Sequence, residues 1–144
     1  MPEDPMELSW NERIIADLRA HGGRSTTPPF VNSNLLILTS TGAKTGKPRT
    51  SPIGYTRDGE TYVIVGSNSG GPVNPVWVRN LLANPLVTVE AAGETFQARA
   101  TVTEGTERRR LLDAHQAAIP IFRKYEQMTE RELPVVTLER IAEA

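Results

Sequence analysis

Two hairpin signals restrict the fold of this chain more than any other feature of its sequence. Asp58-Gly59 and Ala92-Gly93 each stand between two short stretches with the composition of β-strands. Tight turns of this kind join antiparallel strands. Regular alternation of strands with helices, which would indicate parallel βαβ units, is missing from the sequence. Because closing an antiparallel sheet removes its exposed edges, the sequence predicts an α+β domain built on a compact antiparallel barrel.

The other elements are predicted from apolar spacing and from residues that begin or end helices. Residues 35–39 are a short apolar run with the length of a buried strand, and residues 42–52 after it are expected to be irregular. Asn74 followed by Pro75 is typical of a helix start, with Asn74 as the cap. The predicted helices cover residues 8–21, 76–83, 107–118 and 121–127, and the predicted strands cover 35–39, 53–56, 62–65, 86–90, 95–103 and 135–138.

The chain has 144 residues, of which 38% are hydrophobic, and this supports one compact core. We expect residues 1–34 to form an N-terminal helix and linker, and residues 35–144 to form the barrel, within a single domain overall.

Cysteine is absent, which excludes disulfides, thiolate nucleophiles and Cys-based zinc sites. The only histidines, His21 and His115, are far apart in sequence, so no metal site is predicted. His115 is expected at the surface or at the boundary of the core. Chemistry would therefore come from a bound cofactor.

Charge and hydropathy limit the partners and the location that we expect. Sixteen Lys and Arg against seventeen Asp and Glu give a net charge of −1, which argues against a nucleic-acid partner. No apolar stretch has the roughly 18–20 residues of a membrane span, and the acidic N-terminus lacks the pattern of a secretory signal, so a cytoplasmic location is expected. The helix over residues 8–21 should pack one face on the core. The alternative is a weak peripheral contact of this helix with the inner face of the membrane or with a protein partner.

A basic, glycine-containing segment is the first candidate site. Lys44, Lys47 and Arg49 lie within six positions, and no acidic residue occurs between Gly42 and Arg57. Glycines let the backbone approach a ligand closely, while Lys and Arg side chains suit phosphate or carboxylate oxygens. A P-loop is excluded because only three residues separate the two glycines. The alternative to an anion site is a solvated basic loop. The candidate anion-binding segment is residues 41–50, which include Ala43, Lys44, Thr45, Gly46, Lys47 and Arg49.

A second candidate site combines a polar loop with the start of a helix. Small residues that follow a strand suit a flat ligand, and the free N–H groups of a helix N-terminus attract negative charge. Trp77 and Asn80 lie three residues apart and therefore share one face of the predicted helix. The alternative for Trp77 is a position in the core. The candidate residues are Ser67, Asn68, Ser69, Gly70, Asn74, Trp77 and Asn80.

Phe122 and Tyr125 form the third candidate site, near the end of the chain. They are three residues apart on a predicted helix, so both side chains can face one pocket. A tyrosine hydroxyl stays protonated at neutral pH, which makes Tyr125 a candidate proton donor. The alternative is a helix that only covers the barrel and leaves Tyr125 half-buried.

Several of these segments, in order and at fitting spacing, resemble the deazaflavin (coenzyme F420)-dependent nitroreductase and quinone reductase family. This family is part of the split β-barrel group of flavin and deazaflavin oxidoreductases. The resemblance implies a split antiparallel β-barrel of the FMN-binding type, with an N-terminal helix, one inserted helix and C-terminal helices. The residues that carry it are 36–49, Pro52, Arg57-Asp58-Gly59, Gly70-Gly71, residues 74–77, Asn80-Leu81, residues 83–87 and residues 133–136.

The resemblance also implies a cofactor and a reaction. The cofactor is reduced 8-hydroxy-5-deazaflavin, coenzyme F420, whose tail carries a phosphodiester and an acidic lactyl-oligoglutamate. Lys44 and Arg49, with backbone N–H groups of residues 43–46, would hold this tail, and Pro52, the loop over residues 67–71, Trp77 and Asn80 would border the ring. The implied reaction is hydride transfer to a quinone-type or nitro-type acceptor, followed by protonation. The alternatives are an FMN-dependent oxidoreductase of the same fold and a non-catalytic deazaflavin-binding or carrier protein.

Two departures from the family pattern bear on the reaction. Family members often carry a Lys before the paired glycines of the second loop, where this chain has Asn68-Ser69. Nitro-activating relatives have tyrosines three and six residues before the position of Tyr125, where this chain has Phe122 and Ile119. The absence of these two phenols favours quinone reduction over nitro reduction.

Overall fold

The computed structural model describes residues 5–28 and 33–141, which form a curled sheet with helices around it. The helices are α1 (Pro5–Ala20), the short 3-10 helix η1 (Asn68–Gly70), α2 (Val76–Ala83), α3 (Gly105–Ala118) and α4 (Ile121–Gln127). The strands are β1 (Leu35–Thr41), β2 (Pro48–Gly54), β3 (Thr56–Asp58), β4 (Thr61–Val65), β5 (Leu86–Ala91), β6 (Glu94–Val102) and β7 (Val135–Arg140).

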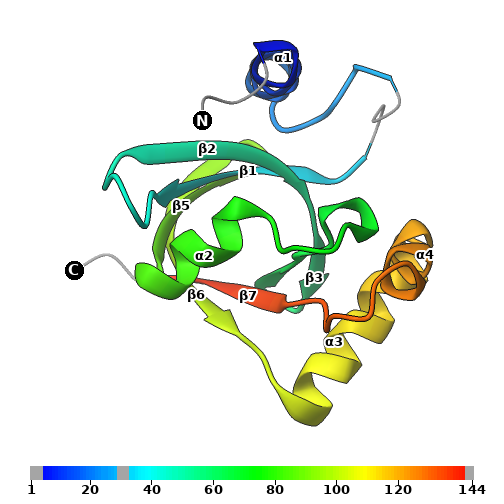
Figure 1. Cartoon of the computed structure of the whole chain (residues 1–144). Helices are drawn as coiled ribbons and strands as arrows, with labels where there is room; N and C mark the ends of the chain where they lie inside the picture. Colours follow the sequence, from blue (N-terminus) through cyan, green and yellow to red (C-terminus); the bar gives the residue numbers. More distant parts are fainter. Residues whose placement is uncertain (1–4, 29–32, 142–144) are drawn as a thin grey trace.

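The strands pair antiparallel in the order β2-β1-β5-β6-β7-β4-β3 and curl into a barrel, which Figure 1 shows end-on. β2 and β3 end this order, so the barrel is open between them, although the chain runs from one to the other through Tyr55. Both predicted hairpins are confirmed, since β3 pairs with β4 around Gly59 and β5 with β6 around Gly93. The fold is therefore the split antiparallel β-barrel of the α+β class that the resemblance implies.

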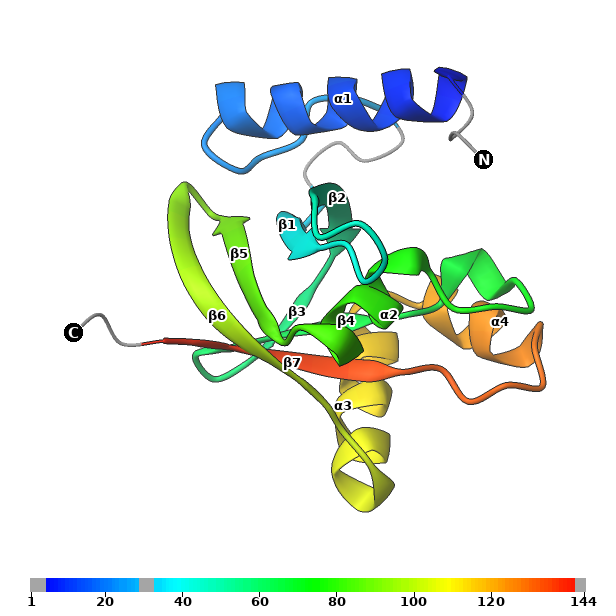
Figure 2. The same ribbon diagram turned by 60° about the vertical axis from the view of Figure 1, so that its left-hand side comes forward.

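The helices cover different parts of the barrel. α1 lies along the outside of β1 and β2, and α2 lies across one end of the barrel (Figures 1 and 2). α3 packs outside β4 and β7, where Leu111 and Leu112 contact Val63 and Val65. α4 follows α3 and lies against η1. The loop with η1, the start of α2 and α4 thus gather on one side of the barrel.

β1 is buried on both faces, and this explains its continuous apolar sequence. Leu36 and Leu38 point into the barrel core, where neither side chain is exposed. The alternate residues Leu35 and Ile37 face outward and pack against α1. A strand covered on only one side would show alternation of apolar and polar residues.

α1 confirms the prediction of a helix that packs one face on the core. Its side chains Ile14 and Leu18 are 1% exposed, because they contact the outer face of β1. These two side chains are therefore unavailable to a membrane, and the side chain of Leu8, which the membrane hypothesis also used, lies outside the described part of the chain. No helix within residues 5–28 and 33–141 is long and apolar enough to cross a membrane.

Two sequence predictions about local structure are wrong. Residues 42–52 are irregular only in their first half, because Pro48–Gly54 form β2 and pair with β1. β2 is an edge strand, and an edge strand tolerates proline because one of its sides needs no hydrogen-bond partner. Asn74 does not cap α2: Pro75 precedes the first helical residue, and no side chain caps this helix. The Asn74 side chain instead accepts a hydrogen bond from Arg131.

Candidate functional site

A cleft of about 710 Å³ lies beside the junction of β2 and β3, and we call it the aromatic cleft. Its walls are that junction, the loop with η1, the start of α2, and α4. Its volume is in the range of cofactor and substrate sites. The residues that line it are Ser33, Asn34, Leu35, Pro52, Ile53, Gly54, Tyr55, Thr56, Val65, Ser67, Asn68, Ser69, Pro75, Trp77, Ala118, Ile119, Ile121, Phe122 and Tyr125.

A second cavity, of about 490 Å³, is lined by part of the predicted basic segment, without Gly46 and Lys47, and we call it the basic pocket. Lys44 and Arg49 line it together with Arg79 of α2, which the sequence analysis did not identify. Residues 42–56 and 61–89, which include the whole lining of this pocket, contain no Asp or Glu. This arrangement suits an anionic ligand. The full lining is Gly42, Ala43, Lys44, Thr45, Arg49, Val76, Arg79 and Asn80.

The two cavities share the same supporting elements. In β2, Arg49 lines the basic pocket and Pro52 lines the aromatic cleft. Three residues of a strand span roughly 10 Å. In α2 and the residue before it, Pro75 and Trp77 line the cleft, whereas Val76 and Asn80 line the pocket. The two cavities therefore lie close to each other along β2 and α2.

The loop between β1 and β2 uses part of its own backbone to hold its shape. The Gly42 N–H donates to the Lys47 carbonyl at 2.8 Å, and the Gly46 N–H donates to the Gly42 carbonyl at 2.9 Å. The Ala43 N–H donates to the Asn80 side chain at 2.9 Å. The N–H groups of residues 43 and 46 are thus engaged within the protein. Of the backbone N–H groups predicted to bind the anion, those of Lys44 and Thr45 donate to no acceptor among the described residues.

Asn80 connects this loop to α2 from a buried position. Its side chain is 2% exposed; Oδ1 accepts the Ala43 N–H, and Nδ2 donates to Ser40 Oγ at 3.3 Å. Asn80 lines the basic pocket and not the aromatic cleft. Its contacts fix the loop that presents Lys44, and a role beside a ring stays a prediction.

Replacing Asn80 by leucine should lower the free energy of unfolding by about 1–3 kcal/mol, because the Ala43 N–H and the buried Ser40 hydroxyl lose their partner. Urea denaturation measures this change. Asn84→Leu is the matched control, because the Asn84 side chain accepts only an exposed N–H, from Leu86. Equal losses in the two variants would contradict the assigned role of Asn80.

Trp77 is both a core residue and a residue of the candidate site, the two alternatives that the sequence left open. It belongs to the barrel core and is 9% exposed, yet part of its ring also borders the aromatic cleft. Such a rigid, buried ring gives the cleft a fixed apolar wall.

Another wall of the cleft comes from α4 and from Ile119, shortly before this helix. Ile119, Phe122 and Tyr125, spaced three residues apart, all line the cleft, as the spacing of the last two predicts. The Phe122 and Tyr125 rings meet edge-to-face with centroids 5.4 Å apart. This wall therefore presents two apolar side chains and one phenol. The role of Tyr125 as proton donor stays a prediction.

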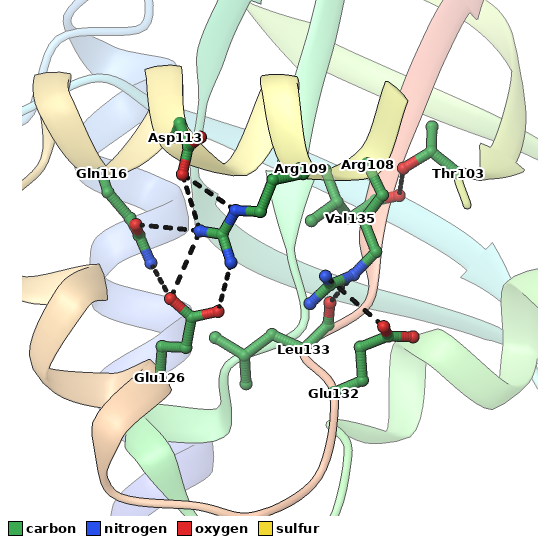
Figure 3. Close-up of polar contacts among 9 residues, drawn as sticks. All are labelled: Thr103, Arg108, Arg109, Asp113, Gln116, Glu126, Glu132, Leu133 and Val135. Atoms are coloured by element: carbon green, nitrogen blue, oxygen red, sulfur yellow. Dashed lines mark hydrogen bonds and ion pairs between the residues drawn. The ribbon is translucent and has the colours of Figure 1, made fainter. Parts of the chain in front are cut away.

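A charged network holds α4 against α3 (Figure 3). The Arg109 guanidinium donates to Glu126 at 2.9 Å and to Asp113 at 2.9 Å. Gln116 Nε2 donates to the same Glu126 carboxylate at 2.8 Å. The bond from Arg109 is the main reason that the pKa of Glu126 is lowered from its usual value. Because Glu126 directly follows Tyr125, this network fixes the helix that carries the phenol.

His115 is buried, and the expectation of a surface or boundary position is wrong. The side chain has no exposed area, because α3 turns it inward together with Leu111 and Leu112. Nδ1 lies 2.8 Å from Thr56 Oγ1, the imidazole meets Phe122 edge-to-face at 4.4 Å, and Nε2 has no partner among the described residues. Burial lowers the pKa of His115 from its usual 6.5 to about 4. The imidazole is therefore neutral at pH 7.

The free energy of unfolding should fall as the pH drops from about 6.5 to 4, partly because of His115. In this window the unfolded chain protonates His115 and the folded chain does not, so acid favours unfolding. The contribution of His115 to this loss is up to about 3 kcal/mol. The His115→Phe variant keeps the contact with Phe122 but cannot titrate, so its loss over the same window should be smaller. Chemical denaturation at several pH values measures both. An identical pH dependence would exclude this role of His115.

The loop between β4 and α2 has an unusual backbone at the cleft wall. Asn68, Ser69 and Gly70 all have positive φ angles, of 46°, 53° and 79°. Gly70 is required here, because a Cβ at this position would lie 2.9 Å from Met128 Cβ. The side chain of Arg131 bonds to this loop, a contact that the sequence analysis did not identify.

Within the described residues, no group of three or more His, Asp or Glu side chains could hold a metal ion. The polar side chains that line the two cavities are instead cations, amides, hydroxyls and the phenols of Tyr55 and Tyr125.

Comparisons with known proteins show which family this chain resembles. The family model described as F420H(2)-dependent quinone reductase matches residues 11–140. The F420H(2)-dependent quinone reductase Rv1261c of Mycobacterium tuberculosis (strain ATCC 25618 / H37Rv) is 37% identical over 108 residues, which are 73% of this chain and 72% of the relative.

Two solved structures show the same fold. One, described as an F420-H2 dependent reductase (FDR-A), has a TM-score of 0.69 and 33% identity, and the match covers 74% of this chain and 94% of that one. The other, described as a domain-swapped dimer, has a TM-score of 0.71 and 28% identity, and the match covers 94% of this chain and 100% of that one.

Proposed function

Because this chain belongs to the F420H(2)-dependent quinone reductase family, we propose that it transfers a hydride from reduced coenzyme F420 to a quinone in the aromatic cleft. Its cofactor is coenzyme F420. The two cavities fit this molecule, since the basic pocket suits an acidic tail and the aromatic cleft suits a planar ring.

The basic pocket would hold the phosphodiester and the carboxylates of the tail. Lys44 provides a compact charge, and Arg49 and Arg79 provide planar donors that suit phosphate and carboxylate oxygens. Asn80 supports this pocket by holding the loop that carries Lys44.

The aromatic cleft would hold the ring of the coenzyme and the acceptor together. Pro52, Trp77 and the η1 loop would border the ring, and α4 would border the acceptor. Asn74, which we predicted to contact the cofactor, bonds to Arg131 and would support the loop. Fixed walls on both sides orient two reactants and exclude water, which lowers the entropic cost of the reaction.

The reaction needs one proton from the protein side. When bound, the reduced coenzyme supplies a hydride, and a quinone that takes up this hydride and one proton becomes a hydroquinone. Tyr125 would deliver that proton from its hydroxyl group to the quinone oxygen and regain one from solvent.

The preference for a quinone as acceptor is inferred from the side chains that α4 and Ile119 present to the cleft. Ile119 and Phe122 place apolar side chains next to Tyr125, and a planar, largely apolar quinone can contact all three. A nitro group gains more from several hydrogen-bond donors, because negative charge builds up on both of its oxygens. We therefore expect menadione to be a good acceptor and a nitroimidazole to be a poor one.

Steady-state oxidation of reduced coenzyme F420 with menadione and with a nitroimidazole tests this preference. The quinone should react with a kcat/KM at least about tenfold higher, equivalent to about 1.4 kcal/mol in the transition state. Equal rates would show that Ile119 and Phe122 do not set the acceptor.

Titration with coenzyme F420 and with FMN separates the remaining alternatives. An FMN enzyme would bind FMN more tightly, although its single phosphate needs fewer cations than the basic pocket offers. A carrier protein would bind coenzyme F420 tightly without turnover of menadione.

A further inference from the structure

Arg131 makes an unusual set of contacts behind the wall of the aromatic cleft. It lies between α4 and β7, and its guanidinium donates to the carbonyls of Gly66 at 3.1 Å, Ser67 at 2.8 Å and Gly71 at 3.0 Å. It also donates to Asn74 Oδ1. All four acceptors are uncharged, and no carboxylate within the described residues forms an ion pair with Arg131. One cation therefore holds both ends of the loop over residues 66–74.

This loop needs such support because of its backbone. Asn68 and Ser69 have left-handed φ angles, which cost of order 1 kcal/mol or more for each residue other than glycine. The segment around Arg131 provides two further contacts, since Met128 packs on Gly70 and the Pro134 carbonyl accepts the Gly66 N–H at 2.8 Å. The connection from α4 to β7 thus determines the shape of the cleft wall.

Arg131 also changes the charge distribution in the loop. The Ser67 carbonyl and the Asn68 N–H belong to the same peptide unit, so donation from Arg131 to the carbonyl makes this N–H more acidic. The N–H groups of Asn68 and Ser69 donate to no acceptor within residues 5–28 and 33–141, and both residues line the cleft. The backbone turns from right-handed at Ser67 to left-handed at Asn68, a succession that places neighbouring N–H groups around an anion.

We propose that Arg131 is a positioning residue that holds and polarises this loop, so that the N–H groups of Asn68 and Ser69 bind an electron-rich oxygen of the coenzyme ring. The identity of the ligand, coenzyme F420, rests on the proposed function, whereas the effect of Arg131 on the loop does not. A positive charge behind these donors favours the negative charge that the conjugated ring carries when its hydroxyl ionises.

Arg131→Gln, Arg131→Lys and the control Arg140→Gln test this proposal. Arg140 also bonds to a neighbour, Glu94, but lines neither the aromatic cleft nor the basic pocket. Three properties are measured: hydrogen exchange of residues 66–74 without coenzyme, affinity for oxidised coenzyme F420 by fluorescence, and the pH dependence of the bound coenzyme's absorption spectrum. The spectrum reports ionisation of the 8-hydroxyl group.

Arg131→Gln should speed exchange in the loop, weaken coenzyme binding by about tenfold or more, and raise the pH at which the bound hydroxyl ionises. Arg131→Lys keeps the charge but not the planar fork. Hydrogen exchange in the loop should therefore still be faster than in the wild type, while the bound hydroxyl ionises near the wild-type pH. Arg140→Gln should change none of these properties.

The proposal is overturned if Arg131→Gln matches Arg140→Gln in loop exchange and in coenzyme affinity. If Arg131→Gln does not fold, Arg131→Lys decides, and wild-type exchange in its loop overturns the proposal. If the wild type binds no coenzyme F420, the proposed function fails, and the exchange measurement still tests the hold of Arg131 on the loop.

Discussion

Replacing Lys44 and Arg49 together by alanine should weaken the binding of coenzyme F420 by about tenfold or more, with little change in thermal stability. Each side chain is expected to make a charge-assisted hydrogen bond to the acidic tail, and the loss of one such bond costs about 1.5–3 kcal/mol. Both side chains are exposed and lie outside the hydrophobic core. Fluorescence titration measures the affinity, and circular dichroism measures the melting temperature.

The matched control is Arg13→Ala with Arg99→Ala, which removes the same charge from residues that line neither the basic pocket nor the aromatic cleft. This control should bind the coenzyme like the wild type. Salt adds a second criterion, because screening should weaken wild-type binding more than binding by the Lys44/Arg49 variant. If the variant retains wild-type affinity, the tail does not bind in the basic pocket.

Replacing Tyr125 by phenylalanine should slow menadione reduction by about 100-fold while coenzyme affinity changes little. General acid catalysis contributes about 10²–10⁴-fold in rate, and this substitution removes only the hydroxyl that would donate the proton. The ring remains, so its edge-to-face contact with Phe122 and the shape of the cleft should persist. Single-turnover kinetics with reduced coenzyme F420 separate the chemical step from binding.

Tyr55→Phe is the control for this experiment, since it removes a second phenol from the wall of the same cleft. Tyr55 belongs to the barrel core beside Tyr62, and burial raises the pKa of its hydroxyl. Its removal should slow menadione reduction much less. Equal rates for Tyr125→Phe and the wild type, or equal losses in both variants, would remove Tyr125 from the mechanism.

The sequence predicted those parts of the fold that depend on local patterns. The buried residues 35–38 of β1 and 63–65 of β4 are apolar because helices cover the outer faces of these strands, and glycine marks the turn of each confirmed hairpin. β2 was not predicted at Pro48–Pro52, because an edge strand with exposed Arg49 and Thr50 has no apolar pattern. Pairing with β1 defines this strand, and no local pattern records that pairing.

The candidate site divides in the same way. Lys44 with Arg49, and Phe122 with Tyr125, are close in sequence, so spacing alone was enough to group them. Thr56 and His115 are 59 residues apart, and Arg131 lies 65 residues from its partner Gly66. Such contacts exist only in the folded chain. Arg79 had a weak signal, namely a helix without acidic residues next to the predicted ligand loop.

The burial of β1 on its outer face has a consequence for any shortened form of this protein. Without α1, Leu35 and Ile37 would be exposed to water beside the edge strand β2. An apolar surface next to an edge with unpaired N–H and C=O groups promotes association between chains. A fragment that starts at residue 35 would keep every residue that lines the basic pocket and yet be prone to aggregate. The N-terminal helix thus covers the apolar surface through which such fragments would associate.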